Sequence, residues 1–416
     1  MDLELSPEQR KIQEMARAFA SEVIAPVAAR NDQDEIYPSE ILSALAPTGL
    51  MAPTLPPEMG GLGADFIGEA LVFEEIGKVC ASVRTVLSVH NSLCALTIQQ
   101  WGTAAQKERY LSALGHGELL GCFALTEFTA GSEATNQNLS ASQHADGWVL
   151  DGTKAWVSSG TRADLCLLFA QTDPQKGYRG ITAFLVPTTT LGFTAEKVEG
   201  KTGLRSAHTA HLTLRGVRLS DEQRLGKIGE GFKIAMSALD NGRYGVAAGC
   251  VGQAQACLDT SIDYAKERRS FGKPLAGHQL VQEMLADMAV QVETARLLVY
   301  QAGHLKNKGV RNTYQTSLAK LHASEAAVQV ARMALQLHGA VGYTQAHTVE
   351  RHLRDALATT IYEGTSQVQK LIIGRHLTGE IWTGYARPNT PRPPANCVSP
   401  NRYVLQRIET LEKLHR

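Results

Sequence analysis

The sequence contains two long stretches of helical periodicity, and between them lies a stretch of short apolar runs that is typical of strands. Up to about residue 118, and again over 229–378, the apolar residues recur at helical spacing. Residues 119–228 instead carry short apolar runs separated by clusters of glycine, aspartate and threonine. No long helical pattern separates these runs, so a parallel sheet built from βαβ units is not expected. This order predicts an α+β multidomain fold with an N-terminal helical domain (1–118), a central small β-barrel or sandwich domain (119–228) and a C-terminal four-helix bundle (229–378).

Local signals locate helices within these zones. Residues 6–9 (Ser-Pro-Glu-Gln) form a capping box with proline at the first helical position, which predicts a helix start. Prolines and glycines between 47 and 63 interrupt the pattern, and helical periodicity returns over about 65–102. Later, six apolar residues fall on one face of a single helix, as in a helix bundle: Val281, Leu285, Met288, Val292, Ala295 and Val299.

A C-terminal extension, residues 379–416, follows the predicted bundle. Several prolines at 388–394 predict an extended segment, and residues 402–415 are compatible with one more helix. No role is predicted for this extension.

Composition excludes several classes of protein. The 416 residues hold 41 lysines and arginines against 41 aspartates and glutamates, so no polybasic face is expected and nucleic acid is not a predicted partner. No stretch of about 18 apolar residues occurs, so no membrane span is predicted. The start, Met1 to Glu4, lacks the basic residues and apolar run of a secretory signal, and none of the 7 cysteines forms a Cys-x-x-Cys pair. We therefore expect a cytoplasmic protein with reduced, mostly buried thiols and neither a disulfide nor a zinc site.

Two patterns suggest chemistry but are better explained by structure. The glycine-rich residues 226–231 precede a helix, yet a phosphate-cradling loop requires a βαβ context, which is missing here. We interpret this segment, and the glycine loop at 60–63, as plain connections. His208 and His211 lie three residues apart on a predicted strand and therefore face opposite sides, so no metal site is predicted.

Four further segments carry chemistry. They are CFALTEFTAGSE (122–133), WVSSG (156–160), RRSFGKPL (268–275) and the stretch 336–367, which includes QLHG, RD and IYEGTSQ. In this order, and spread over more than half of the chain, they resemble acyl-CoA dehydrogenases. The resemblance implies the fold of that family, which has the same three domains, and a flavoprotein oxidoreductase that binds FAD between the β domain and the bundle.

The resemblance assigns FAD contacts to two sets of residues. In the same subunit it implies Phe123, Leu125, Thr126, Gly131, Ser132, Trp156, Ser158, Thr365 and Gln367. In the neighbouring subunit it implies Arg268, Phe271, Gln279, Gln336 and Gly339. The residue types suit such a site, because hydroxyls can reach the flavin ring, an aromatic side chain can pack on it, arginine binds pyrophosphate and a helix start binds phosphate.

Glu363, in the segment IYEGTSQ, matches the catalytic base of the family. Desaturation of a thioester requires removal of the α proton while the β hydrogen leaves as hydride to flavin N5. A carboxylate in an apolar pocket has a raised pKa and suits this task, while the family uses the backbone N–H of the base and an FAD hydroxyl to polarise the carbonyl. Some relatives place the base on another helix, near 240–243, and the corresponding position in this chain is glycine. Glu363 therefore has no rival as the base. Without the other segments, a glutamate before a glycine would be interpreted as a helix cap.

Substrate-binding residues are also implied by the resemblance. Ser132, Asp240 and Arg243 match residues near the acyl channel, and Arg243 is expected to anchor the loop around Glu363. Arg84 lies in a segment similar to that of glutaryl-CoA dehydrogenases, where an arginine receives a distal carboxylate. The same segment is similar to that of carrier-protein-dependent dehydrogenases of polyketide pathways. A surface or interface ion pair is the alternative for Arg84.

Three positions depart from the family pattern. Phe128 stands where proline is common, Glu133 stands where aspartate is common, and Ala340 stands where a second glycine is common. These positions match places beside the flavin and the acyl channel, so we expect an unusual substrate shape.

The resemblance also implies partners and leaves alternatives. The expected substrate is an acyl-CoA or an acyl carrier protein, the expected electron acceptor is an electron-transferring flavoprotein or a similar protein, and the expected assembly is a homotetramer or a dimer. One alternative on the same fold is an oxygen-using oxidase or monooxygenase, although the chain is too short for the long oxidases and the monooxygenases lack the glutamate. A glutaryl-type dehydrogenase and a non-catalytic, carrier-protein-binding member are the others.

Overall fold

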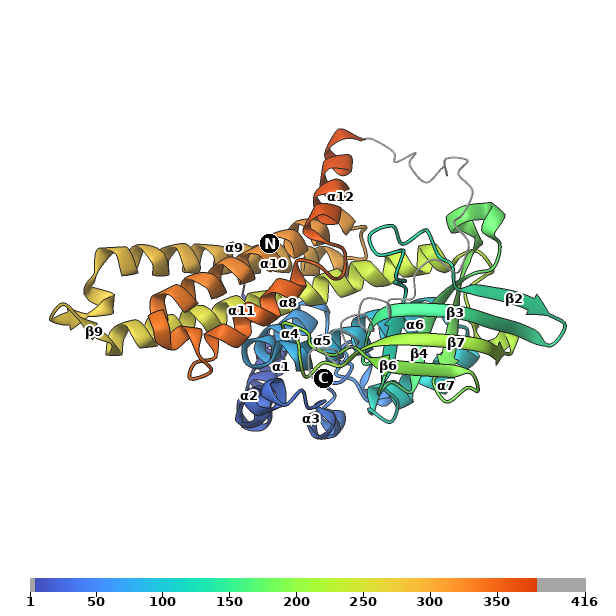
Figure 1. The fold of residues 1–416 in the computed structure, drawn as a ribbon, viewed down its shortest axis with the longest axis horizontal. Coiled ribbons are helices and arrows are strands. Elements are labelled where there is room, and N and C mark those ends of the chain that lie inside the picture. Colours follow the sequence, from blue (N-terminus) through green and yellow to red (C-terminus); the bar gives the residue numbers. More distant parts are fainter. Residues whose placement is uncertain (1–3, 380–416) are drawn as a thin grey trace, which may run out of the picture. The chain divides into compact units, whose positions relative to one another are not determined.

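Helices form the first part of the structure, a computed structural model that describes residues 4–379 (Figure 1). They are α1 (Pro7–Phe19), α2 (Ala25–Gln33), α3 (Ser39–Leu45), α4 (Phe66–Val79), α5 (Ala81–Ser88), α6 (Leu96–Trp101) and α7 (Ala104–Gly115), with π-helical segments at Ala20–Ile24 and Val89–Ala95 and 3-10 turns at Ala46–Thr48 and Pro57–Met59. The predicted helix start is confirmed, because the Ser6 hydroxyl accepts the Gln9 N–H at 3.1 Å and the Gln9 side chain accepts the Ser6 N–H at 2.9 Å. The helical stretch predicted over 65–102 is also confirmed, but extended backbone at Cys80 divides it after α4.

The middle of the chain forms one eight-stranded mixed sheet. Its strands are β1 (Gly121–Ala124), β2 (Ser140–His144), β3 (Gly147–Ser158), β4 (Leu165–Gln171), β5 (Ile181–Pro187), β6 (Phe193–Lys197), β7 (Thr209–Leu219) and β8 (Arg224–Leu225), with 3-10 turns at Pro174–Gly180 and Asp221–Gln223. They lie in the order β6-β7-β3-β2-β4-β5-β8, and β1 pairs with β4 in parallel. On β4, Cys166 and Leu168 contribute to a core between the strands, whereas Leu165 and Leu167 pack with residues of α7 and the start of α8.

Long helices form the last part. They are α8 (Gly231–Glu267), α9 (Gln279–Asn307), α10 (Thr313–His338), α11 (Val349–Thr359) and α12 (Ser366–Thr378), with a small hairpin of β9 (Arg269–Ser270) and β10 (Lys273–Pro274) and 3-10 turns at Leu275–Gly277 and Gly339–Tyr343. The predicted apolar face of α9 is buried at Met288, Val292, Ala295 and Val299. Figure 1 shows that α8 runs from the sheet to the β9 hairpin at the far end of the helices.

The predicted succession of helices, sheet and helices is confirmed, and the described residues form one compact unit. The six described cysteines are free and buried, as predicted, while Cys397 and the features expected of the C-terminal extension lie outside the described residues. Within residues 4–379, no helix is long and apolar enough to cross a membrane. The glycine loops have structural roles, since a Cβ on Gly61 would lie 2.0 Å from the Leu55 carbonyl oxygen and one on Gly231 would lie 2.6 Å from the Thr182 carbonyl carbon.

Candidate active site

The loop between α11 and α12 holds Glu363 in an uncommon backbone conformation. Glu363 has a φ of 57° and Gly364 a φ of 83°. A left-handed conformation at a non-glycine residue costs about 1–3 kcal/mol and persists only where the surroundings hold it. Arg243 Nε donates to the Glu363 carbonyl at 3.3 Å, as the predicted anchor of this loop. Gln369 Nε2 donates to both carbonyls, at 3.1 and 3.0 Å, and Lys320 Nζ donates to the Gly364 carbonyl at 2.7 Å.

The Glu363 carboxyl lies in a confined position. Its Oε2 is buried and has no hydrogen-bond partner among the described residues, although other parts of the residue are partly exposed. A Cβ on Gly242 would lie 2.4 Å from Glu363 Oε1, so α8 approaches closely only because that residue is glycine. Burial raises the pKa of Glu363 to about 7, and three cations oppose the rise: Arg243, Lys320 and Arg84. A carboxyl with this pKa can accept a proton near neutral pH.

Arg84, on α5, is a fully buried cation beside this loop. Its exposed fraction is 0%, and its Nη2 donates to the Tyr362 hydroxyl at 2.8 Å. Its Nε and Nη1 find no acceptor in the part of the chain that the structure describes. A Cβ on Gly249 would lie 2.4 Å from Arg84 Nε, so the guanidinium uses space that only glycine leaves. The interpretation of Arg84 as a surface or interface ion pair is therefore wrong, and two buried donors are free for a further group.

Asp240 lies one turn before Arg243 on α8 and is engaged within the chain. Its Oδ1 accepts from Arg243 Nη1 at 3.0 Å, and its Oδ2 accepts from the Thr313 hydroxyl at 2.7 Å. The two predicted channel residues thus form an ion pair that orients Arg243 toward the Glu363 loop.

The first predicted set of FAD residues centres on the ends of β1 and β3. The Ala155 N–H donates to the Thr126 carbonyl at 2.8 Å, so Leu125 and Thr126 lie beside Trp156. Trp156 lies at an irregularity of β3 with a φ of 61°, and 57% of it is exposed. Lys154 is buried and its Nζ donates to the Leu125 carbonyl at 3.1 Å, which fixes this loop to β3. The arrangement leaves a large aromatic face open to a ligand.

Other members of this set differ in accessibility. Ser158 ends β3, and Gly131 and Ser132 are exposed on the loop after β1. Apart from its two neighbours in the chain, no described residue has an atom within 4 Å of a Cβ placed on Gly131, so this part of the loop borders open space. Phe123 instead packs on Phe169 at a ring distance of 5.1 Å and joins the hydrophobic core. It contributes more to packing than the sequence suggested.

Two predicted phosphate-binding residues lie at the start of α12. The Thr365 hydroxyl accepts the Val368 N–H at 3.2 Å, so Thr365, not Glu363, caps this helix. Gln367 is exposed in the first turn. A helix start of this kind favours an anion.

Phe128, one of the departures from the family pattern, belongs to an aromatic group around Trp156. The His211 ring lies 4.6 Å from the Phe128 ring and 5.2 Å from the Trp156 ring. The three rings form a surface that a proline at 128 would lack.

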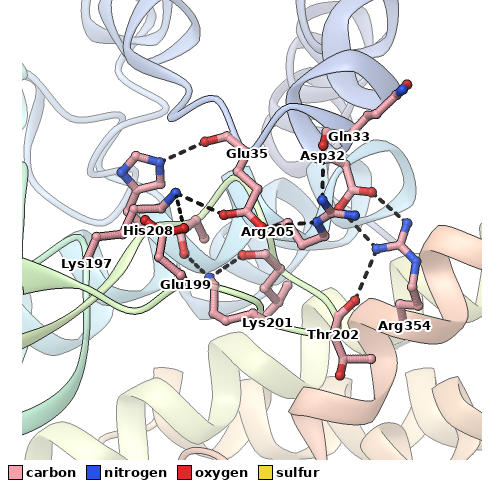
Figure 2. A network of polar contacts seen from close by, with 12 residues as sticks. Asp32, Gln33, Glu35, Lys197, Glu199, Lys201, Thr202, Arg205, His208 and Arg354 are labelled. Carbon is pink, nitrogen blue, oxygen red and sulfur yellow. Dashed lines mark hydrogen bonds and ion pairs between the residues drawn. The ribbon is translucent and has the colours of Figure 1, made fainter. Parts of the chain in front are cut away.

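A polar network gathers around the loop between β6 and β7 (Figure 2), and this loop contacts the residues that follow Trp156. The Ser159 N–H donates to the His208 carbonyl at 2.7 Å, and the Tyr37 hydroxyl donates to Ser159 Oγ at 2.9 Å. His208 Nε2 lies 2.9 Å from the Glu35 carbonyl oxygen, and Arg354 of α11 donates to the loop backbone at 3.2 Å. The network also includes Asp32, Gln33, Lys197, Glu199, Lys201, Thr202 and Arg205. It joins the N-terminal helices, the sheet and α11 next to Ser158.

The second predicted set of FAD residues lies at the far end of the helices. It consists of Arg268, Phe271 and Gln279 at the corner between α8 and α9, and of Gln336 and Gly339 at the end of α10. Tyr264 stacks on His338 at 4.3 Å, which joins the two places. Because α8 has 37 residues, about 55 Å at roughly 1.5 Å per residue, this set does not meet the first set within one chain (Figure 1).

Several residues that hold the site were not predicted from the sequence. Lys320 lies on the buried face of α10 between Thr316 and Ala323, where a small or apolar residue is expected. A charged residue on such a face is a signal that could have identified it. Gln369 and Tyr37 have no comparable signal, because each acts through a partner that only the fold brings near.

Three family models match the chain, those of the acyl-CoA dehydrogenase N-terminal domain (residues 6–118), middle domain (122–217) and C-terminal domain (229–378). The mitochondrial short-chain specific acyl-CoA dehydrogenase of Mus musculus is 41% identical over 90% of this chain and 91% of its own. The structure of butyryl-CoA dehydrogenase from Megasphaera elsdenii is 40% identical, with a TM-score of 0.89 over 91% of this chain and 100% of its own. A glutaryl-CoA dehydrogenase in complex with glutaryl-CoA is 36% identical, with a TM-score of 0.88 over 91% and 97%. The chain therefore belongs to the acyl-CoA dehydrogenase family.

Proposed function

We propose that this chain is an FAD-dependent dehydrogenase that introduces an α,β double bond into an acyl thioester, with Glu363 as the catalytic base. The observation that supports this most directly is the Glu363 carboxyl, whose Oε2 is buried without a partner and whose pKa burial raises to about 7. Thr365 caps the following helix, so the carboxylate is not needed there. A glutamate kept in this costly state is expected to act on a ligand.

Proton removal requires the α carbon of the thioester to lie against Glu363 Oε2. As the carboxylate accepts the α proton, negative charge develops on the thioester carbonyl oxygen. The Glu363 N–H has no acceptor among residues 4–379, and it is the donor that the chain offers to this oxygen. Bound FAD supplies the acceptor of the β hydride.

The residues of the first set fit a flavin. Trp156 offers an exposed aromatic face beside Leu125 and Thr126, and the loop at Gly131 borders open space. A flat aromatic ring system is the kind of ligand that such a face binds. Thr365 and Gln367, at the start of α12, would favour a phosphate.

The second set fits the same cofactor only if another copy of the chain supplies it. Phe271 and Leu280 are 94% and 78% exposed, which is unusual for large apolar side chains and favours burial against another molecule. We propose that Arg268 and Phe271 bind FAD held mainly by a neighbouring copy, in a homotetramer or a dimer.

Arg84 favours an acyl group with a polar or carboxylated end. Two of its buried donors lack an acceptor, and leaving such donors unpaired costs about 1–3 kcal/mol. A carboxylate or carbonyl on the acyl chain would satisfy them. This makes a glutaryl-type substrate the second candidate, with the thioester carried by CoA or by an acyl carrier protein.

We propose an electron-transferring flavoprotein or a similar protein as the electron acceptor, and the cytoplasm as the compartment. The six described cysteines, free and buried, are consistent with a reducing compartment. Oxygen is the competing acceptor, and rapid reoxidation of the reduced flavin by air would favour it.

The test is anaerobic flavin bleaching by a panel of thioesters. Butyryl, isovaleryl, octanoyl and glutaryl groups would be offered on CoA and on a carrier protein, to the wild type and to Glu363→Gln. We expect one thioester to bleach the flavin, and the variant to be at least about 100-fold slower with unchanged flavin content. Equal rates in the two proteins would overturn the assignment of the base. A protein that contains flavin but is bleached by no thioester would favour the oxygen-using alternative.

A further inference from the structure

Lys320 is a completely buried lysine that faces the Glu363 loop from α10. Its exposed fraction is 0%, and its Nζ donates to the Gly364 carbonyl at 2.7 Å. Thr316 and Ala323, on the same buried face, are small and leave its side chain room. Burial of an ammonium is unfavourable unless its surroundings compensate, and one carbonyl compensates only in part. A nearby negative charge would stabilise the ammonium form.

Of the other two cations near Glu363, Arg243 has a carboxylate partner and Arg84 does not. Arg243, from α8, forms an ion pair with Asp240 at 3.0 Å. Arg84, from α5, hydrogen-bonds to the Tyr362 hydroxyl and donates to no carboxylate among the described residues. The charge of Arg243 is thus largely balanced before it acts on Glu363.

Lys320, in contrast to Arg243, forms no ion pair with a carboxylate among the described residues. On α10, Glu325 accepts from the Ser366 hydroxyl at 2.5 Å and forms no ion pair with Lys320. Cys250 and Arg243, from α8, also lie close to Lys320, and burial raises the pKa of the Cys250 thiol. Of the two carboxyls that act on Lys320, Glu363 is the one with a buried oxygen, Oε2, that has no hydrogen-bond partner among the described residues.

We propose that Lys320 is a positioning residue for the base: its ammonium holds the Gly364 carbonyl, which fixes the left-handed turn at 363–364, and its charge favours the carboxylate form of Glu363. This inference rests on the proposed role of Glu363. Lys320 itself touches neither substrate nor cofactor in this scheme.

The protonation behaviour of the pair is consistent with that role. Burial raises the pKa of Glu363 to about 7 and lowers the pKa of Lys320 to about 8. The proton-transfer rate should rise as Glu363 loses its proton and fall again as Lys320 loses its own, because both the charge and the donor are then weakened.

The test isolates the proton step from the redox step. On enzyme whose flavin has been reduced beforehand, no hydride can leave, so a saturated thioester in D₂O exchanges only its α proton: the proton passes to Glu363, and the resulting carbanion takes up a deuteron. Mass spectrometry of the thioester gives the exchange rate at each pH. Lys320→Met removes the charge and the donor, Lys320→Arg keeps both, and Lys306→Met is the matched control, because Lys306 is a lysine of α9 whose Nζ donates to Asn241 at 2.7 Å.

We expect the thioester to exchange about tenfold more slowly at pH 7 with Lys320→Met. In the plot of exchange rate against pH, the rise on the acidic side should lie about one pH unit higher, and the fall on the alkaline side should be absent. Lys320→Arg should return the rise on the acidic side to its wild-type pH, and Lys306→Met should have the wild-type exchange rate at each pH. A wild-type profile in Lys320→Met would overturn the inference, and if that variant does not fold, the same profile in Lys320→Gln would do so. Exchange in Glu363→Gln at the wild-type rate would instead overturn the role of Glu363, so the two failures are distinguishable.

Discussion

The Glu363 loop and the corner around Phe271 are built in opposite ways. The carbonyls of the loop are bonded by Arg243, Lys320 and Gln369, all from the same chain. Phe271 also has a left-handed backbone, with a φ of 50°, but it is 94% exposed. A strained residue that its own chain encloses can be positioned by folding alone, whereas a strained and exposed aromatic residue is explained by something that binds it. In the proposed function, one chain therefore provides the proton chemistry and two copies hold the cofactor.

Complementation between inactive variants tests this difference directly. Glu363→Gln and Arg268→Ala, each inactive alone, should regain activity when they are co-expressed. A site that takes Glu363 from one copy and Arg268 from the other is then intact, and about a quarter of all sites should be so. The measurement is flavin bleaching by the active thioester after purification of the mixture.

The control is co-expression of Glu363→Gln with Arg243→Gln. Glu363 and the Arg243 that holds its loop come from the same chain, so every site contains one of the two changes and no activity should return. Recovery in the control pair, or none in the test pair, would contradict the comparison.

Glu363→Gln should also stabilise the protein at alkaline pH. Burial raises the folded-state pKa of Glu363 to about 7 from its ordinary value of 4.5, so the folded state resists an ionisation that the unfolded chain undergoes freely. The contribution of Glu363 to stability therefore falls by about 3 kcal/mol as the pH rises from 4.5 to 7, and the glutamine variant lacks this loss. Urea unfolding at pH 4.5, 6 and 8, with equal flavin content, measures the difference.

Glu267→Gln, at the exposed end of α8, is the control for the loss of one negative charge. A variant of Glu363 that is no more stable than the wild type at pH 8 would mean that the carboxylate is well solvated in the fold. The fold would then not enclose Glu363 at a cost in stability, and the Glu363 loop would differ less from the exposed corner around Phe271.

The sequence identified the parts of the site that lie in short contiguous patterns. The segment with Glu363 is one of these, and the expected contact with Arg243 is present. Lys320 was missed because its partner Gly364 lies 44 residues further on, and a helical lysine is exposed by default. The fold could be predicted from its periodicity, whereas the break at Cys80 and the widened turn at Val89–Ala95 could not, because they depend on packing between helices.

The smallest expected effect concerns the acyl end of the pocket. Arg84→Met should lower kcat/KM for glutaryl thioesters by about 10- to 100-fold, the loss expected for hydrogen bonds to a charged group. Butyryl thioesters have no group for the guanidinium, so their kcat/KM should change little. Arg84→Lys keeps the charge but not the planar fork, so its kcat/KM for glutaryl thioesters should lie between those of the wild type and Arg84→Met. An equal loss of kcat/KM for both thioesters would show that Arg84 acts on the Glu363 loop through Tyr362, its one hydrogen-bond partner among the described residues. The enclosed region around Glu363 would then hold the base and would not recognise the acyl group.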